Sequence, residues 1–361
     1  MKNAEQIYVD FHVIQTVPPS CVNRDDTGSP KTAVYGVVTR ARVSSQAWKR
    51  AIRLMFRDAF TQDEVGVRTK MVVDMIAEEI SRLQPEAKAE KLAVAVLTAA
   101  GVKVKDNKGK QETGALFFIS RKQVEALAAL AAEHPDGKLE KAECQAALKQ
   151  EPAVDIALFG RMVADDPSLN FDAAAQVAHA ISTHAVHNEY DYFTAVDDCA
   201  PEDNAGAGHL GTVEYNSATL YRYATVNLTE LAKGLQGDTA KALRGFADAF
   251  VRSMPTGKQN TFANRTRPDA VYVAIRRDQP VNMAGAFEKP VRTGREGYVE
   301  ASEQAFVRYA QESYKDYVAA PETAFAVGEA MEPLAVPVSL THLLDALKAW
   351  AEGHTAGEVA Q

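Results

Sequence analysis

The chain has 361 residues, of which 46% are hydrophobic, and its formal net charge is −8 with a sequence pI near 5.6. It contains no run of about 18 apolar residues, so the sequence predicts no membrane-spanning helix. Its first residues lack the layout of a secretory signal, and its three widely spaced cysteines argue against a disulfide framework or a zinc ribbon. We therefore expect a cytoplasmic protein with roughly two to three domains and no membrane partner.

The charge is unevenly distributed along the chain. The segment from Pro18 to Arg57 contains eight basic and two acidic residues, which makes it +6 and the remainder −14. A second stretch, residues 252–267, contains four basic residues and no acidic one. An acidic protein that concentrates cations in two places is typical of a protein with a local binding site for a polyanion.

The first elements follow from alternation and capping. In residues 8–14, Val9, Phe11 and Val13 alternate with the other side chains, which predicts a strand. The strand is expected to stop at Pro18-Pro19, and a loop rich in turn-forming residues follows. The apolar residues 33–38 predict a second strand. Ser44 or Ser45 can then cap a helix. The apolar stripe expected on that helix consists of Trp48, Ile52, Met55 and Ala59.

The rest of the chain predicts a helical insertion, a hairpin and a second α/β segment. Residues 68–171 are rich in Ala and helical in period, and residues 172–184 are expected to form one more helix. Residues 188–228 are aromatic and β-prone at both ends with a polar, Gly-rich middle, which predicts a long β-hairpin. Without the insertion and the hairpin, the remaining order is compatible with an α+β fold of ferredoxin-like or RRM-like type.

Seven blocks then point to a known family. In order they are CVNRDD, GVVTRARVSSQAWKRAIR, DIALFGRM, HAISTHAVHNEYDYFTAVDD, HLGTVEYNSATLYRYATVNL, GKQNTF and NMAGAFEKPV. Together they resemble the CasC-type backbone subunit of the type I-E CRISPR Cascade complex, over about Tyr8 to Val291. The resemblance implies an RRM-like palm in residues 1–60 and 224–361, a helical fingers insertion in 61–188 and a thumb hairpin in 189–223.

The resemblance also implies partners and a mode of action. Several copies are expected to stack along one crRNA, and each thumb is expected to displace a base at regular intervals while base pairing with the target DNA strand reads the sequence. The implied partners are crRNA, target DNA, other copies of the chain, the large, small, guide-processing and 5′-end-capping Cascade subunits, and a recruited helicase-nuclease. The resemblance implies no catalytic site, no cofactor and no metal.

Basic residues of the first segment are the main candidates for RNA contacts. Lys49, Arg50 and Arg53 can donate to phosphates from one helix without reading sequence, and Gln46 lies beside them. Ser44 and the first free N–H groups of the helix can add an anion site. The other candidates in this segment are Arg24 and Lys31, on the loop, and Arg40 and Arg42, on one strand face. The alternative for all of them is an ordinary solvated surface.

Later candidates supply aromatic rings and polar groups. Tyr192 and Phe193 can stack on any base, but as neighbours on a strand they point to opposite sides, and the other ring can instead anchor the hairpin. Thr194 belongs to the same block, and Lys258, Gln259 and Asn260 form either an RNA-facing loop or a flexible connector. The hairpin acids predict that this arm docks on a basic patch of another copy; they are Glu189, Asp191, Asp197, Asp198, Glu202, Asp203 and Glu214. From the resemblance, Met162 beside Arg161 wedges against a displaced nucleotide, and the candidate contacts to target DNA are Lys138, Lys141 and Lys149.

Two other functions stay open from the sequence. One is a metal-dependent RNA nuclease that uses Asp25, Asp26 or the histidines 179, 184 and 187. On a helix, His179 and His187 would lie about 12 Å apart along the axis, too far for one zinc shell, and the two aspartates are expected to cap a turn. The other is a stand-alone RNA-binding protein of RRM type.

Overall fold

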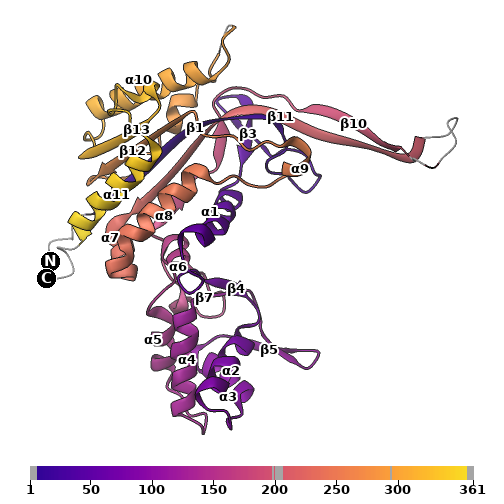
Figure 1. The fold of residues 1–361 in the computed structure, drawn as a ribbon, viewed down its shortest axis with the longest axis vertical. Helices are drawn as coiled ribbons and strands as arrows, with labels where there is room; N and C mark the ends of the chain where they lie inside the picture. Colours follow the sequence, from indigo (N-terminus) through magenta and orange to yellow (C-terminus); the bar gives the residue numbers. More distant parts are fainter. Residues whose placement is uncertain (1–5, 197–198, 200–205, 293–294, 356–361) are drawn as a thin grey trace. The chain divides into compact units, whose positions relative to one another are not determined.

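The computed structural model describes residues 6–196, 199, 206–292 and 295–355 (Figure 1). The chain divides into two compact units, each built from three stretches of sequence. The first, which we call the sheet unit, comprises Met1–Leu54, Val177–Thr225 and Ala247–Ala346. The second, which we call the helical unit, comprises Met55–Gln176, Val226–Phe246 and Leu347–Gln361.

A large antiparallel sheet has the strand order β13-β12-β1-β11-β9-β3-β2, with β8 and β10 also paired to β11. This mixture of sheet and helices confirms the predicted α+β class. The strands of this sheet are β1 (Tyr8–Ser20), β2 (Thr32–Tyr35), β3 (Val38–Val43), β8 (Ala175–Val177), β9 (Ala180–Ser182), β10 (Glu189–Val196), β11 (Gly206–Asn227), β12 (Ala270–Arg276) and β13 (Thr323–Val327).

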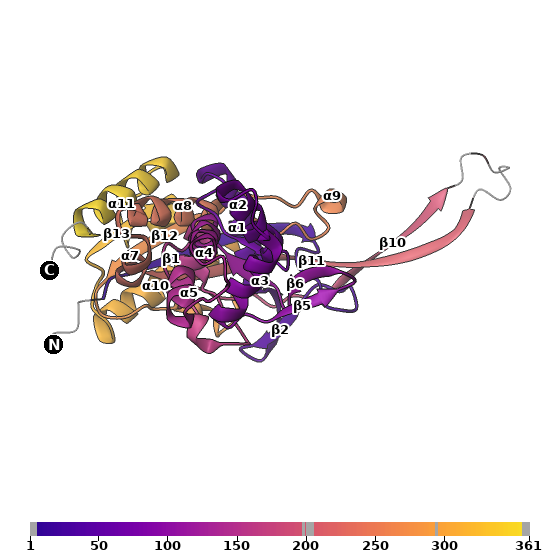
Figure 2. The same ribbon diagram turned by 90° about the horizontal axis from the view of Figure 1, so that it is seen from below.

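Strand β1 lies in the interior of this sheet and forms as predicted, although it continues to Ser20, beyond the two prolines. The single strand expected at residues 33–38 is instead a tight hairpin. Gly36 and Val37 both have positive φ angles, 57° and 61°, which suits the two-residue turn between β2 and β3. The hairpin of β10 and β11 extends away from the rest of the sheet (Figures 1 and 2).

Several helices precede or follow these strands in the sequence. They are α1 (Ser45–Ala59), α8 (Thr239–Arg252), α9 (Gln259–Phe262), α10 (Val299–Asp316) and α11 (Leu340–Thr355), with short 3-10 turns η4 (Met283–Phe287) and η5 (Glu329–Met331). Trp48 and Ile52 of α1 are buried as predicted, but the next buried position is Phe56, while Ala59 is exposed. A spacing of four residues keeps Phe56 on the buried stripe.

The helical unit packs its helices around a separate apolar core. Its elements are α2 (Val72–Leu83), α3 (Ala89–Ala100), α4 (Arg121–Glu133), α5 (Lys141–Lys149), α6 (Val154–Phe159) and α7 (Leu228–Leu235), 3-10 turns η1 (Pro167–Leu169) and η3 (Gln236–Asp238), and the strand pairs β4 (Val67–Thr69) with β7 (Phe117–Ile119) and β5 (Val104–Asn107) with β6 (Lys110–Thr113). The expectation of an all-helical block is therefore wrong at these strands.

No helix within the described ranges is long and apolar enough to span a membrane.

The helix expected over residues 172–184 is also wrong. This segment forms β8 and β9, and β9 is hydrogen-bonded between β11 and β3. Its Ala-rich composition favours a helix locally, but pairing with two strands that are distant in sequence decides its conformation.

Candidate nucleic-acid interface

A cleft of about 310 Å³ on the sheet unit brings together three segments that are far apart in the sequence. The loop after β1 contributes Arg24, helix α1 contributes Arg50, and the segment after α8 contributes residues 254–257. We call this the basic cleft. Both Arg24 and Arg50 are exposed, so their guanidinium groups are accessible to a ligand.

Close backbone contact holds the third segment in place. A Cβ atom on Gly257 would lie 2.1 Å from the carbonyl oxygen of Val22, so only glycine permits this approach. Lys258 follows directly in a left-handed conformation, with φ of 46°. Burial raises the pKa of the Cys21 thiol, and the nearby charges of Arg24 and Lys258 oppose that rise. Lys258 directly follows Gly257, which lines the basic cleft, so it adds a cation beside the cleft.

The start of α1 is fixed by hydrogen bonds. The Ala47 N–H donates to Ser44 Oγ at 3.3 Å, and the Ser44 N–H donates to Asn23 Oδ1 at 2.9 Å. Ser44 thus caps the helix as predicted, but it is buried and already bonded, so it presents no anion site of its own. Further along α1, Gln46 is exposed while Lys49 and Arg53 are half-buried, and burial lowers the pKa of Lys49.

A second group of cations lies around Lys31 and Arg42. Arg42 Nε donates to the Thr32 carbonyl oxygen at 3.1 Å, and its Nη1 lies 3.2 Å from His179 Nδ1. Burial lowers the pKa of His179, and the charges of Arg42 and Lys31 lower it further. Asn23 lines both the basic cleft and a smaller hollow beside Lys31 and Arg42. The two cation groups therefore adjoin each other.

Arg40 does not belong to this surface, and its assignment as an RNA contact is wrong. Its side chain is fully buried. Nε donates to the carbonyl oxygen of Tyr35 at 3.0 Å, Nη1 to that of Ser182 at 3.0 Å, and Nη2 to that of Phe287 at 2.8 Å. Arg40 and Arg42 do share a strand face, but Arg40 is covered by the chain around η4.

Arg161, in the helical unit, was also wrongly predicted to contact RNA. It is only 5% exposed, and its guanidinium donates to the carbonyl oxygens of Phe118, Leu148 and Leu169. Burial lowers its pKa to about 10. The neighbouring Met162 is 84% exposed, so only this member of the predicted pair is presented at the surface.

The hairpin of β10 and β11 presents different rings on its two faces. Tyr192 is paired with Thr212 and is 67% exposed. Phe193 faces the opposite side, where its ring lies against Gly211. Thr194 is exposed on the Tyr192 side. Of the hairpin acids, Asp197, Asp198, Glu202 and Asp203 lie outside the described residues.

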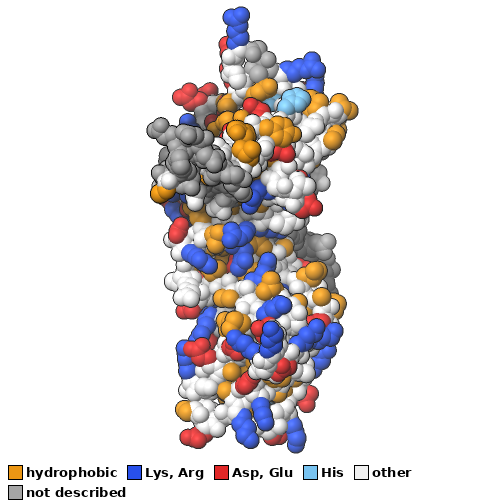
Figure 3. All heavy atoms as spheres, turned by 90° about the vertical axis from the view of Figure 1, so that its right-hand side faces the viewer, with side chains coloured by type: hydrophobic (Ala, Val, Ile, Leu, Met, Phe, Trp, Pro, Cys, Tyr) orange, Lys and Arg blue, Asp and Glu red, His pale blue; other side chains and the backbone are white. Residues whose placement is uncertain are grey.

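Helix α9 contacts the base of the hairpin. The rings of Phe262 and Tyr215 have their centroids 5.8 Å apart, and strand alternation places Tyr215 on the same face as Phe193. The predicted loop residues Gln259 and Asn260 belong to this short helix. On the face of the molecule that carries the hairpin, Lys and Arg side chains are interspersed with hydrophobic ones (Figure 3).

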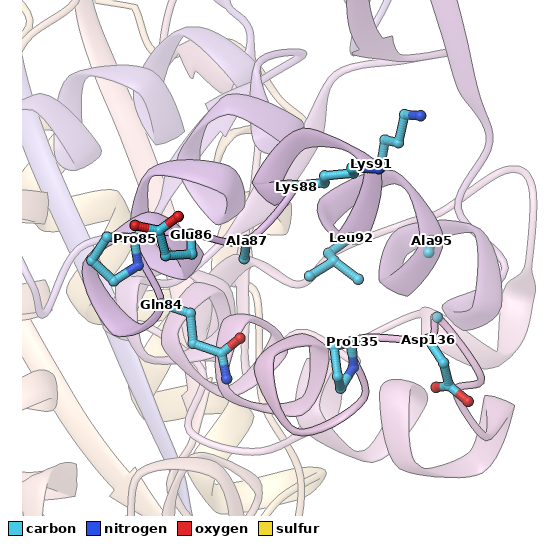
Figure 4. Close-up of a pocket in the computed structure, with 11 residues that line it drawn as sticks. Gln84, Pro85, Glu86, Ala87, Lys88, Lys91, Leu92, Ala95, Pro135 and Asp136 are labelled. Carbon is cyan, nitrogen blue, oxygen red and sulfur yellow. The ribbon is translucent and has the colours of Figure 1, made fainter.

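The lysines proposed to contact target DNA are not gathered at one place. Lys138 pairs with Asp136 at 3.6 Å and Lys141 with Asp166 at 3.0 Å. Lys149 lines a different cleft of about 910 Å³. A further cleft of about 780 Å³ lies between the turn after α2, helix α3 and residues 135–137, with Leu92 among its lining residues (Figure 4).

Two of the residues considered for metal or acid chemistry, Asp25 and His184, have structural roles. Asp25 accepts hydrogen bonds from Thr27 and from the Ser29 N–H, and these bonds lower its pKa. His184 accepts the Thr219 N–H at 3.1 Å and stacks on Tyr298 with centroids 3.6 Å apart. Within the part of the chain that the structure describes, no three His, Cys, Asp or Glu side chains are grouped to hold a metal.

The fold and the site define an α+β protein whose sheet unit carries a basic cleft and a long aromatic β-hairpin. The model of the CT1975-like protein family matches residues 9–350, and the chain therefore belongs to this family. A search of curated proteins gave no match.

Two solved structures resemble the chain over nearly its whole length. One is described as "CRISPR RNA-guided surveillance complex, pre-nicking": it is 35% identical with a TM-score of 0.80, and the match covers 95% of this chain and all of that one. The other, "CRISPR RNA-guided surveillance complex", is 30% identical with a TM-score of 0.71, over 95% of this chain and 99% of that one. These matches confirm the resemblance to a Cascade-type backbone subunit, and the assignment to type I-E stays a prediction.

Proposed function

We propose that the chain is a guide-RNA-binding backbone subunit of a type I-E CRISPR surveillance complex. Its family and its similarity to chains of RNA-guided surveillance complexes support this proposal. In such an assembly several copies follow one crRNA, the hairpin displaces bases at intervals, and the exposed stretches of guide pair with target DNA in antiviral defence. The remaining partners are the other Cascade subunits and a helicase-nuclease, and the chain itself contributes no catalytic group.

The observation that carries the proposal is the basic cleft. It brings Arg24 and Arg50 together from separate segments, and Lys258 directly follows its lining residue Gly257. Among the described residues, neither Arg24 nor Arg50 forms an ion pair, whereas Lys122 and Lys233 of the helical unit pair with Glu151 and Glu230. Unpaired cations on a surface bind phosphates of any sequence, which a subunit that accepts different guides requires.

The test is a double substitution, Arg24→Ala with Arg50→Ala, assayed with single-stranded RNAs of unrelated sequence. Affinity should fall about equally for every RNA, and the slope of log affinity against log salt should decrease by about 2, roughly one for each phosphate that the variant no longer binds. The matched control is Lys122→Ala with Lys233→Ala, which removes the same charge from the helical unit. An unchanged affinity and salt slope in the Arg24/Arg50 variant would contradict the assignment of the cleft.

Two further measurements separate the alternatives. A subunit that lines a guide should load several copies on a long RNA at a regular nucleotide spacing, which size-exclusion chromatography detects, whereas a stand-alone RRM-type protein should not. Incubation of RNA with magnesium or manganese should give no multiple turnover. Turnover that disappears in Asp25→Ala or Asp26→Ala would instead support the nuclease.

A further inference from the structure

A buried arginine contacts the three elements that lead into the walls of the basic cleft. Arg222 of β11 is 1% exposed, and burial lowers its pKa to about 9. Among the described residues, no acidic side chain forms an ion pair with it or offsets the effect of burial on its pKa. Because an unpaired charge destabilises the interior of a protein, the stability of the fold alone does not explain an arginine at this position.

The first contact of Arg222 is with α1, the helix that carries Arg50. The guanidinium group lies over the Trp48 ring, 3.8 Å from its centroid. Trp48 is buried, and a cation stacks most strongly on a ring where water is excluded. Ala47, directly before Trp48, lines the cleft together with Arg50. The stacking therefore fixes the turn of α1 that presents Arg50.

The second contact is with the C-terminal end of α8. Nη2 of Arg222 donates to the carbonyl oxygen of Phe250, and Nη1 donates to that of Val251 at 3.5 Å. Carbonyl groups in the last turn of a helix have no partner within the helix and form the negative end of its dipole, so a guanidinium group suits them. The chain then continues into residues 254–257, which form the third wall of the cleft.

The third contact is with β1, through Gln15. Nη1 of Arg222 donates to Gln15 Oε1 at 2.6 Å. The amide nitrogen of Gln15 donates to the carbonyl oxygen of Thr266 at 3.0 Å and lies 3.4 Å from Met254 Sδ. Met254 lines the cleft, and β1 leads into the loop that carries Arg24. Gln15 therefore links Arg222 to the two remaining walls.

We propose that Arg222 is the residue that positions Arg24 and Arg50 for RNA, because its buried guanidinium group holds the three segments of the basic cleft at a fixed spacing. Arg222 is itself buried and does not touch the RNA. This inference rests on the proposed function and names the residue on which the geometry of that site depends. Lysine cannot take this role, because an ammonium group has no planar fork that stacks on a ring while it donates in several directions.

The experiment compares Arg222→Lys with Arg276→Lys in the full-length protein. Arg276 is another buried arginine of the sheet unit, and it donates to Asp278, Gln279 and Ala319, none of which lines the basic cleft. Both variants should lose stability in chemical denaturation. Affinity for single-stranded RNA, measured where both variants are folded, should fall on the order of tenfold in Arg222→Lys alone, with a shallower salt slope. Wild-type affinity and slope in folded Arg222→Lys, or an equal loss in Arg276→Lys, would overturn the proposal.

A double-mutant cycle shows whether Arg222 acts through the cleft. In a protein that already carries Arg24→Ala with Arg50→Ala, Arg222→Lys should cause almost no further loss of affinity, because the residues that it positions are gone. Additive losses would show that Arg222 affects RNA binding by another route and would refute the positioning role.

A second variant covers the case in which Arg222→Lys does not fold. Gln15→Met has a similar volume but removes both the acceptor for Arg222 and the donor to Thr266, so it should give the same pattern in the cycle. An Arg24/Arg50 variant that binds RNA as the wild type does would defeat the proposed function itself. A weakened Arg24/Arg50 variant beside normal binding in the Arg222 or Gln15 variant would defeat only this inference.

Discussion

The interior of the sheet unit and the basic cleft on its surface both use arginine, but for different purposes. In the interior, Arg40 donates to backbone carbonyls, and Arg222 donates to Gln15 and stacks on the Trp48 ring, 3.8 Å from its centroid. In the cleft, Arg24 and Arg50 are exposed. A cluster of positive charge in the sequence therefore need not form a positive surface. Four sets of substitutions test this contrast.

The largest effect is expected from Arg40→Ala. This change leaves several buried or part-buried carbonyl oxygens without a donor, among them those of Ser182 and Phe287. We expect the free energy of unfolding to fall by about 3 kcal/mol or more. Chemical denaturation measures this change, and Arg50→Ala serves as the exposed control, with a change within about 0.5 kcal/mol. Equal destabilisation of the two variants would remove the distinction between interior and cleft.

The next largest effect is expected from Gly257→Ala, which adds a methyl group 2.1 Å from the Val22 carbonyl oxygen. The segment that carries Lys258 must then move away from the loop of Arg24. We expect stability to fall by about 1–3 kcal/mol and RNA binding to weaken. Gly237→Ala is the control, because no atom lies within 4 Å of its added Cβ. Wild-type affinity in the Gly257 variant would show that the cleft does not depend on this close approach.

A smaller effect concerns pH and the buried His12. Burial lowers the pKa of His12 to about 3, so the stability that its neutral form contributes is present above about pH 6.5 and is lost as the pH falls toward 3. Burial raises the pKa of Asp10 to about 6, so Asp10 has the opposite effect: its contribution is present at low pH and is lost as the pH rises through 6. The two trends offset each other between about pH 6 and 4.

Replacing His12 by Phe should therefore reveal the contribution of Asp10. Relative to the wild type, the variant should gain stability on acidification by about 1.4 kcal/mol per pH unit below 6.5. Denaturation curves at pH 7 and 5.5 measure the difference, and His342→Ala, at an exposed position, is the control. Parallel pH profiles of the wild type and the His12 variant would contradict the burial argument.

The smallest effect on RNA affinity is expected from a double substitution in the helical unit. Lys103 pairs with Asp165 at 3.1 Å and Lys141 with Asp166 at 3.0 Å, so their charges are already compensated. Lys103→Ala with Lys141→Ala should leave affinity for single-stranded guide RNA within about twofold of the wild type, because exposed ion pairs contribute little. Filter binding or fluorescence anisotropy checks this. A decrease in affinity as large as that of Arg24→Ala with Arg50→Ala would show that RNA contacts extend over the helical unit.

Much of the sheet unit could be predicted from local patterns. Alternation indicated β1, the Ser44 cap and the i, i+4 spacing indicated α1, and the aromatic segments around a polar middle indicated the hairpin. The strands β8 and β9 were missed because their pairing partners lie elsewhere in the chain.

Local patterns were enough to predict the elements whose stability is local, and the order of seven short blocks was enough to predict the family. Which cations reach the surface depends instead on the tertiary structure. Arg40 and Arg50 belong to the same basic segment, yet Arg40 is buried because Ser182 and Phe287, more than a hundred residues away, supply its acceptors. Burial is a property of contacts between distant segments, and the periodicity of one segment does not contain it.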